Sequence, residues 1–135
     1  MIRSYTELKR LKTFRERYKY LKLRGVVGAQ TFGRSRYLNQ VLYQSHEWRK
    51  ARDIVIIRDN ACDLGIEGYD IFDQIHVHHM NPIRPDDIEN NRDIVFDPEF
   101  LICTAFETHN AIHYGDDSLL PQLNVERKPG DTLLW

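Results

Sequence analysis

The chain contains little cysteine and no long apolar run. Its 135 residues include two cysteines, Cys62 and Cys103, which are too few and too far apart for a disulfide framework or a four-cysteine zinc site. We therefore expect both to be buried thiols. No apolar stretch approaches the roughly 20 residues that cross a bilayer, and the first residues lack the apolar segment of a secretory signal. These absences argue against a membrane span and predict a protein that stays in the cytosol.

The net charge of −1 conceals a strong asymmetry. Residues 1–58 carry fifteen Lys or Arg against four Asp or Glu, whereas residues 59–135 carry four against sixteen. A basic half of this kind suits a nucleic-acid backbone, since phosphate neutralisation supplies most of such affinity. The alternatives are that the basic part docks on the acidic half of its own chain, or that its charges simply form the solvent-exposed face of a helix.

The length corresponds to one domain with an appended arm. Apolar residues at three- and four-residue steps predict an amphipathic helix over residues 5–23 with a positive polar face. A loop is expected after Gly25, then a helix over about 36–43. Ser45 is expected to cap a further helix that reaches Asp59.

The second half is expected to begin with a β-hairpin over residues 60–79, closed by Pro82 and Pro85. A short helical turn and loop should follow over 84–98, then an apolar piece over 100–103, then a helix that ends at Gly115. The tail 116–135 is expected to be irregular. The expected apolar cluster consists of Trp48, Phe72, Phe96, Leu101, Phe106 and Ile112.

Four of the six histidines form two short clusters, which are the candidate functional residues. His109 and His113 are four residues apart on the expected helix, so both can point at one ion. His78 and His79 are neighbours on the expected strand and should point to opposite sides. One of that pair can therefore bind a metal while the other remains free for proton transfer.

The order strand, His-His, linker, short strand and then His-x-x-x-His on a helix resembles the HNH endonuclease family, over roughly Trp48 to Gly115. The resemblance implies an α+β fold with a ββα-metal core and an N-terminal basic helical extension. It divides the chain into a basic helical arm (1–45), a nuclease core (46–116) and a C-terminal tail that packs on the core (117–135). The basic front and the residues 125–132 look like small HNH proteins of tailed bacteriophages and prophages, which would place the protein in the cytoplasm of a bacterial host cell.

The resemblance makes His79 the general base and makes His78, His109 and His113 ligands of one divalent metal ion. A histidine titrates near neutral pH and can accept a proton from water. Imidazole ligands suit Zn²⁺ or Ni²⁺, while Mg²⁺ or Mn²⁺ is the ion expected in function. The implied activity is hydrolysis of DNA phosphodiester bonds, linked to phage genome processing or packaging, with phage terminase or portal proteins as possible partners.

The sequence departs from the family at two places. Phe100 stands where the family has its middle asparagine, and a phenylalanine cannot make that hydrogen bond; the alternatives are Asn81, Asn90, Asn91 and Asn110. Ala105 and Thr108 stand where many relatives have the second Cys-x-x-Cys pair of a zinc knuckle. Phe100 favours the rival function, a DNA-binding or packaging accessory protein of weak activity that keeps the metal for structure. A metal-stabilised protein-interaction module is a third possibility.

Several other polar residues have two possible roles. His76 shares a strand face with His78 and is either a plain strand residue or a metal or phosphate contact, and His46 is expected to cap or solvate. The candidate DNA contacts are Arg58, Arg49 and Arg52, with a helix-end salt bridge as the alternative for Arg58. Asp59 and Asp63 are expected in turn or capping roles rather than as metal ligands.

Overall fold

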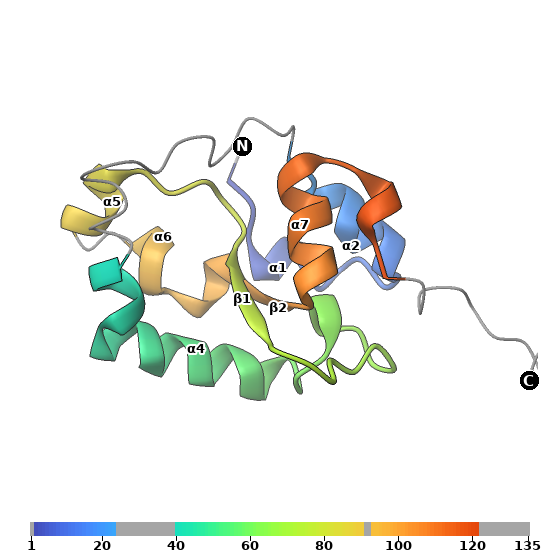
Figure 1. Ribbon diagram of the computed structural model, residues 1–135, viewed down its shortest axis with the longest axis horizontal. Helices are drawn as coiled ribbons and strands as arrows, with labels where there is room; N and C mark the ends of the chain where they lie inside the picture. Colours follow the sequence, from blue (N-terminus) through green and yellow to red (C-terminus); the bar gives the residue numbers. More distant parts are fainter. Residues whose placement is uncertain (1, 24–39, 91–92, 122–135) are drawn as a thin grey trace, which may run out of the picture.

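The computed structural model describes residues 2–23, 40–90 and 93–121, and it shows a mixed helical and strand architecture (Figure 1). The expected loop after Gly25, the start of the expected helix at 36–43 and most of the tail lie outside these residues; residues 40–44 are helical. The described elements are α1 (Tyr5–Leu8), α2 (Phe14–Leu21), α4 (His46–Arg58), η1 (Asp63–Gly65), β1 (His76–His79), α5 (Pro85–Glu89), α6 (Asp93–Phe96), η2 (Pro98–Phe100), β2 (Leu101–Thr104), α7 (Phe106–Tyr114) and η3 (Asp117–Leu119).

The central sheet has two antiparallel strands, β1 and β2, in a register that pairs His76 with Thr104 and His79 with Leu101. The expected hairpin over 60–79 is therefore wrong, because the strand that carries the histidine pair takes its partner from beyond residue 100. Residues 62 and 70 form only an isolated bridge. Asn60, Ala61 and Leu64 have positive φ values, which bend this segment into turns in place of a first strand.

The expected helix over 5–23 is interrupted, so that prediction is also wrong. The side chain of Thr13 accepts a hydrogen bond from the backbone N–H of Glu16, and the Glu16 carboxylate accepts one from the N–H of Thr13. This capping box starts α2 afresh after α1 has ended at Leu8. The polar face is not wholly solvated either, because Arg17 is buried and donates to the carbonyls of Leu11 and Leu64.

α1 and α2 pack into the main core rather than standing apart from it. Tyr18 donates from its hydroxyl to the carbonyl of Ala111 in α7, and the backbone N–H of Leu23 donates to Ile112. Figure 1 shows α2 lying beside α7. One buried cluster joins the N-terminal helices to β2 and α7 through Leu8, Phe14, Tyr18, Leu21, Leu23, Leu64, Met80, Ile102, Ala111 and Ile112.

A second buried cluster lies between α4 and the other face of the sheet. It contains Leu42, Trp48, Ala51, Val55, Val95, Leu101 and Cys103. Ser45 caps α4 as expected, accepting from the N–H of Trp48. Trp48, Leu101 and Ile112 are buried as predicted and Phe96 is partly buried, but Phe72 and Phe106 were wrongly assigned to the core, being 83% and 56% exposed.

The helix that carries the second histidine pair ends where the sequence predicted. Gly115 adopts φ 63, the left-handed conformation that closes α7, and a Cβ at this position would collide with the carbonyl oxygen of Leu23. The region 84–98 forms α5, α6 and the start of η2 in place of one turn and a loop. Both cysteines are free and buried, and no helix in the described ranges is long and apolar enough to cross a membrane.

Candidate metal centre

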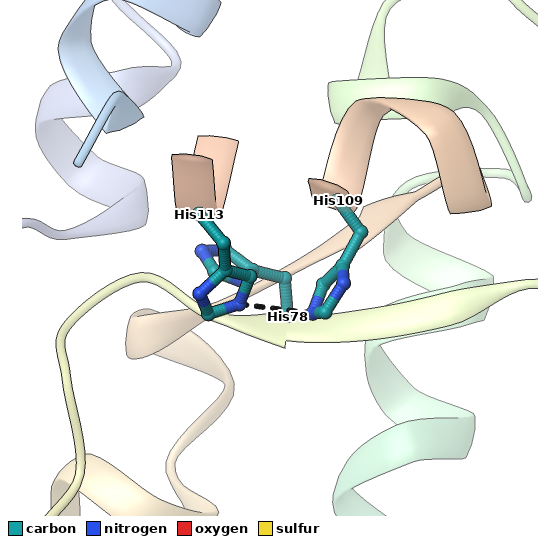
Figure 2. A group of neighbouring side chains, drawn as sticks. All are labelled: His78, His109 and His113. Atoms are coloured by element: carbon teal, nitrogen blue, oxygen red, sulfur yellow. Dashed lines mark hydrogen bonds between the residues drawn. The ribbon is translucent and has the colours of Figure 1, made fainter. Parts of the chain in front are cut away.

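Three of the four predicted histidines converge at one point between β1 and α7. One ring nitrogen from each of His78, His109 and His113 lies within 4.8 Å of the other two. Figure 2 shows the two rings from α7 turned toward the ring of His78 on the strand below. The Nε2 atoms of His109 and His113 are 3.1 Å apart, with one ring donating its N–H to the other.

The local backbone explains this convergence. A four-residue spacing on α7 stacks His109 and His113 on one face of the helix, and α7 lies across β1. Alternation along β1 turns His78 toward α7, where its ring makes edge contacts with both helix rings at centroid distances of 5.2 and 5.0 Å. Short-range periodicity on each element therefore places the three rings together once the elements pack.

The protonation state of these rings suits metal binding, which requires neutral imidazole. Burial lowers the pKa of His78 well below its usual value, with further contributions from His109 and His113. Burial, followed by the nearby His113, lowers the pKa of His109 to about 4, and burial also lowers the pKa of His113. All three rings are accordingly neutral at pH 7.

Two observations test whether the three rings fit an ion. The Nε2 atom of His78 is buried and has no hydrogen-bond partner among the described residues, although buried ring nitrogens ordinarily have one. Two nitrogen ligands of one tetrahedral Zn²⁺ are separated by about 3.3 Å, from Zn–N bonds of about 2.0 Å. The separation of 3.1 Å between His109 and His113 is close to that value. Together the three histidines form a donor set that could hold one metal ion.

His79, the predicted general base, lies outside the three-ring cluster. It is 8% exposed, and its ring stacks on Trp48 with centroids 5.0 Å apart. Its Nε2 is 3.0 Å from the carbonyl oxygen of Val95. A carbonyl only accepts hydrogen bonds, so Nε2 carries the proton and Nδ1 holds the lone pair of the neutral ring. Burial lowers its pKa to about 4, partly offset by the bond to Val95, so the ring is neutral at pH 7.

His76 lies at the edge of the site without joining the cluster. Its ring stacks on His109 at 5.5 Å and contacts Phe106 at 5.7 Å. Its Nε2 is buried and lacks a hydrogen-bond partner in the described part of the chain, as is also true of His78. His46 is exposed at the first turn of α4.

The three candidate DNA contacts differ in how their side chains are used. Arg58 forms an ion pair with Asp59 at 2.9 Å and donates to the carbonyls of Pro98 and Leu101. Its guanidinium also covers the ring of Tyr5 at 3.7 Å, so the helix-end salt bridge is confirmed and the group is held inside the fold. Arg52 donates to the carbonyl of Ile75, whereas Arg49 is exposed.

Two buried carboxylates hold the strands and α7 in place. Asp59 accepts from the backbone N–H of Cys103 in β2. Asp63 accepts from the N–H of Ala105 at 3.2 Å and from the hydroxyl of Thr108, and so joins η1 to the start of the helix that carries the histidines. Burial raises the pKa of Asp63 to about 6. Asp63 lies in the turn η1, in agreement with the expected turn role, but the sequence had no signal for its contacts with the start of α7.

The four asparagines considered as substitutes at the Phe100 position differ in what they contact. Asn81 is buried and exchanges two hydrogen bonds with the backbone of Arg3, which attaches the N-terminal segment to the loop after β1. Asn110 is half-buried and follows His109 on α7. Asn90 is exposed, and Asn91 lies outside the described residues. The carbonyl of Phe100 accepts from Met80, so backbone contacts fix the segment after the histidine pair.

The chain matches none of the protein-family models, curated proteins or solved structures with which it was compared.

Proposed function

We propose that this protein is a divalent-metal-dependent endonuclease of the HNH type that hydrolyses DNA phosphodiester bonds. The observation that supports the proposal most directly is the buried, unpartnered Nε2 of His78 facing two neutral histidines of α7. Three neutral nitrogen donors with one side left for water or substrate are typical of a catalytic rather than a structural metal site. A bound cation would polarise the phosphate and stabilise charge on the leaving oxygen.

In this proposal, His79 removes the proton from the attacking water. The bond from Nε2 to Val95 fixes the tautomer that has its lone pair on Nδ1, and the stack on Trp48 fixes the plane of the ring. Because adjacent strand residues face opposite sides, His79 is free of the metal while remaining next to a ligand. His78, His109 and His113 hold the ion.

DNA would be held by the exposed cations of the N-terminal helices and of α4. The exposed cations are Lys9, Arg10, Lys12, Arg15, Lys19, Lys22, Arg49 and Lys50. Phosphate contacts of this kind give affinity without sequence preference and weaken as salt rises. We also propose a phage origin, a bacterial cytoplasmic location, and a role in genome processing or packaging with terminase or portal proteins.

The test is cleavage of supercoiled plasmid by metal-stripped protein supplied in turn with Mg²⁺, Mn²⁺, Ni²⁺ and Zn²⁺. Wild type should nick in at least one of these, and His79→Ala and His79→Gln should not. The glutamine amide can still donate to Val95, so that variant separates loss of the base from loss of the fold. The matched control is His46→Ala, an exposed histidine whose removal should leave cleavage unchanged. Calorimetry should show equal metal affinity in all four proteins.

A second candidate function is a DNA-binding or packaging accessory protein in which the metal only stabilises the fold. The burial of His79 under Trp48 favours it, because a general base must be reached by water. Phe100 at the asparagine position favours it as well. Under this alternative, metal and DNA still bind, and metal removal lowers the melting temperature, but no ion supports nicking.

A further inference from the structure

A pocket separate from the histidine cluster lies beside the start of α7. Its volume is about 740 Å³, and it is bordered by the loop 68–74, by residues 105–107 and by residues 120–121. Pockets that bind small ligands or a few side chains of a peptide range over roughly 300–1,000 Å³. The space is therefore large enough for a specific ligand, and neither the metal proposal nor the nuclease proposal uses it.

The pocket exposes two aromatic rings. Phe72 and Phe106 line it and are mostly exposed, and the partly buried Ile71 and Leu120 add apolar surface. Exposed large apolar side chains that gather around one hollow mark interaction sites more often than isolated ones do. Two phenylalanine faces also offer a surface on which a cation can rest.

The charged residues that line the pocket all have the same sign. They are Asp63, Asp70, Asp73 and Glu107, and the lining includes no Lys, Arg or His. Asp63 accepts hydrogen bonds from Ala105 and Thr108. The side chains of Asp70, Asp73 and Glu107 are exposed, and Asp70 also accepts a bond from the thiol of Cys62. Such a rim attracts cations and repels phosphate groups.

We propose that this pocket binds a peptide segment of a partner protein in which arginine or lysine alternates with apolar side chains. The cationic groups would pair with Asp70, Asp73 and Glu107, and the apolar groups would pack on Phe72 and Phe106. A nucleic acid fits poorly, because its phosphates would meet the carboxylates. The pocket is thus a protein-docking surface on the acidic half of the molecule, and the proposal requires neither metal nor DNA.

The pocket is connected to the candidate metal centre through ring contacts. Phe106 contacts His76 at 5.7 Å, and His76 stacks on His109 at 5.5 Å. A peptide that packs against Phe106 should therefore alter the magnetic environment of His76 as well. This provides a spectroscopic reading of where the peptide binds.

The experiment titrates the full chain, in EDTA, with a pentapeptide amide that has three arginines alternating with one phenylalanine and one leucine. Aromatic ¹H–¹³C NMR spectra should show saturable shifts of Phe72, Phe106 and His76. The paired variant Asp73→Asn with Glu107→Gln, and separately Phe72→Ala, should each weaken binding at least threefold. The matched control pair is Asp86→Asn with Asp93→Asn, exposed carboxylates away from the pocket, which should leave the affinity unchanged.

The proposal is overturned if the arginine peptide gives no saturable shifts at Phe72 and Phe106, or if the control pair weakens binding as much as the pocket pair. It is also overturned if a peptide with glutamates in place of the arginines binds equally well. A hexathymidylate oligonucleotide that shifts the same rings would assign the pocket to nucleic acid instead. Since no metal is present, these outcomes are independent of whether the protein cleaves DNA.

Discussion

Metal affinity should fall by less than about tenfold between pH 7.0 and pH 5.5. Protons compete with a metal for each imidazole, and an ordinary histidine with a pKa of 6.5 is about three-quarters neutral at pH 7.0 but only about one-tenth neutral at pH 5.5. Three such ligands together would lose about 600-fold in affinity over this range. Here burial lowers the pKa of His109 to about 4, lowers that of His113, and lowers that of His78 further below its usual value. His78 and His109 therefore remain neutral at pH 5.5, so only His113 can lose affinity to protons, and the expected loss is less than about tenfold.

The assay is competition for Zn²⁺ or Ni²⁺ with a chelator of known pH dependence, at 7.0 and 5.5. His113→Ala, which leaves two of the three nitrogens, should bind far more weakly at both pH values. His46→Ala should match wild type. A fall of more than a hundredfold in wild type, with the circular dichroism spectrum unchanged, would show that the three rings are solvated like free histidines. The geometry of the buried cluster would then be wrong.

Three further predictions concern the fold that holds the cluster. Without metal, the free energy of unfolding should fall as the pH drops from about 6.5 toward 4. The pKa values of His79 and His109 are lowered in the folded protein, so the unfolded chain binds more protons over this pH range. His79 alone should account for a loss of up to about 3 kcal/mol, which urea unfolding measures. Gly115→Ala should cost more than about 1 kcal/mol, since the φ of 63 is strained for alanine and its Cβ meets the carbonyl of Leu23; an unchanged urea midpoint would contradict this. Asp63→Ala should destabilise the protein by about 2–4 kcal/mol, because it leaves the N–H of Ala105 and the hydroxyl of Thr108 without a hydrogen-bond acceptor. The control, Asp53→Ala on the exposed face of α4, should have little effect on the melting temperature.

The parts of the site that the sequence predicted are those set by local periodicity. The spacing of His109 and His113, the stop at Gly115 and the opposite orientations of His78 and His79 all follow from repeats of a few residues. The pairing of His76 with Thr104 does not, because it joins residues 28 positions apart and depends on which strands meet when the chain collapses.

The errors have physical causes that can be named. Thr13 and Glu16 have the sequence of a capping box, which predicts the start of a new helix. The three- and four-residue spacing of apolar residues continues across them, however, and that spacing alone predicts one uninterrupted helix. Phe72 and Phe106 were placed in the core by residue type, although type alone does not distinguish a buried ring from one that borders a pocket. Burial of Arg17 depends on carbonyls at Leu11 and Leu64, and the contact with Leu64 spans 47 positions, which no local pattern shows.

The largest consequence of the structure concerns the basic half of the chain. A detachable basic arm could be deleted to test its contribution to DNA binding, but residues 5–23 supply Leu8, Phe14, Tyr18 and Leu21 to the core. Deleting them would unfold the protein, so loss of affinity in such a truncation would carry no information. The useful change is reversal of exposed charges on α2, such as Arg15→Glu with Lys19→Glu, which leaves the packing intact.

The same packing connects the basic surface to the three candidate metal ligands. α2 is joined to α7 by the bond from Tyr18 to Ala111, and the chain that leaves α2 is joined to it by the bond from Leu23 to Ile112, one residue before His113. The cations of α2 are therefore held in a fixed position relative to the histidine cluster. If these cations bind the DNA backbone, they also determine which phosphate lies at the metal. Charge reversal on α2 should then lower the rate of cleavage at saturating DNA as well as the affinity, whereas a flexible arm would change the affinity alone.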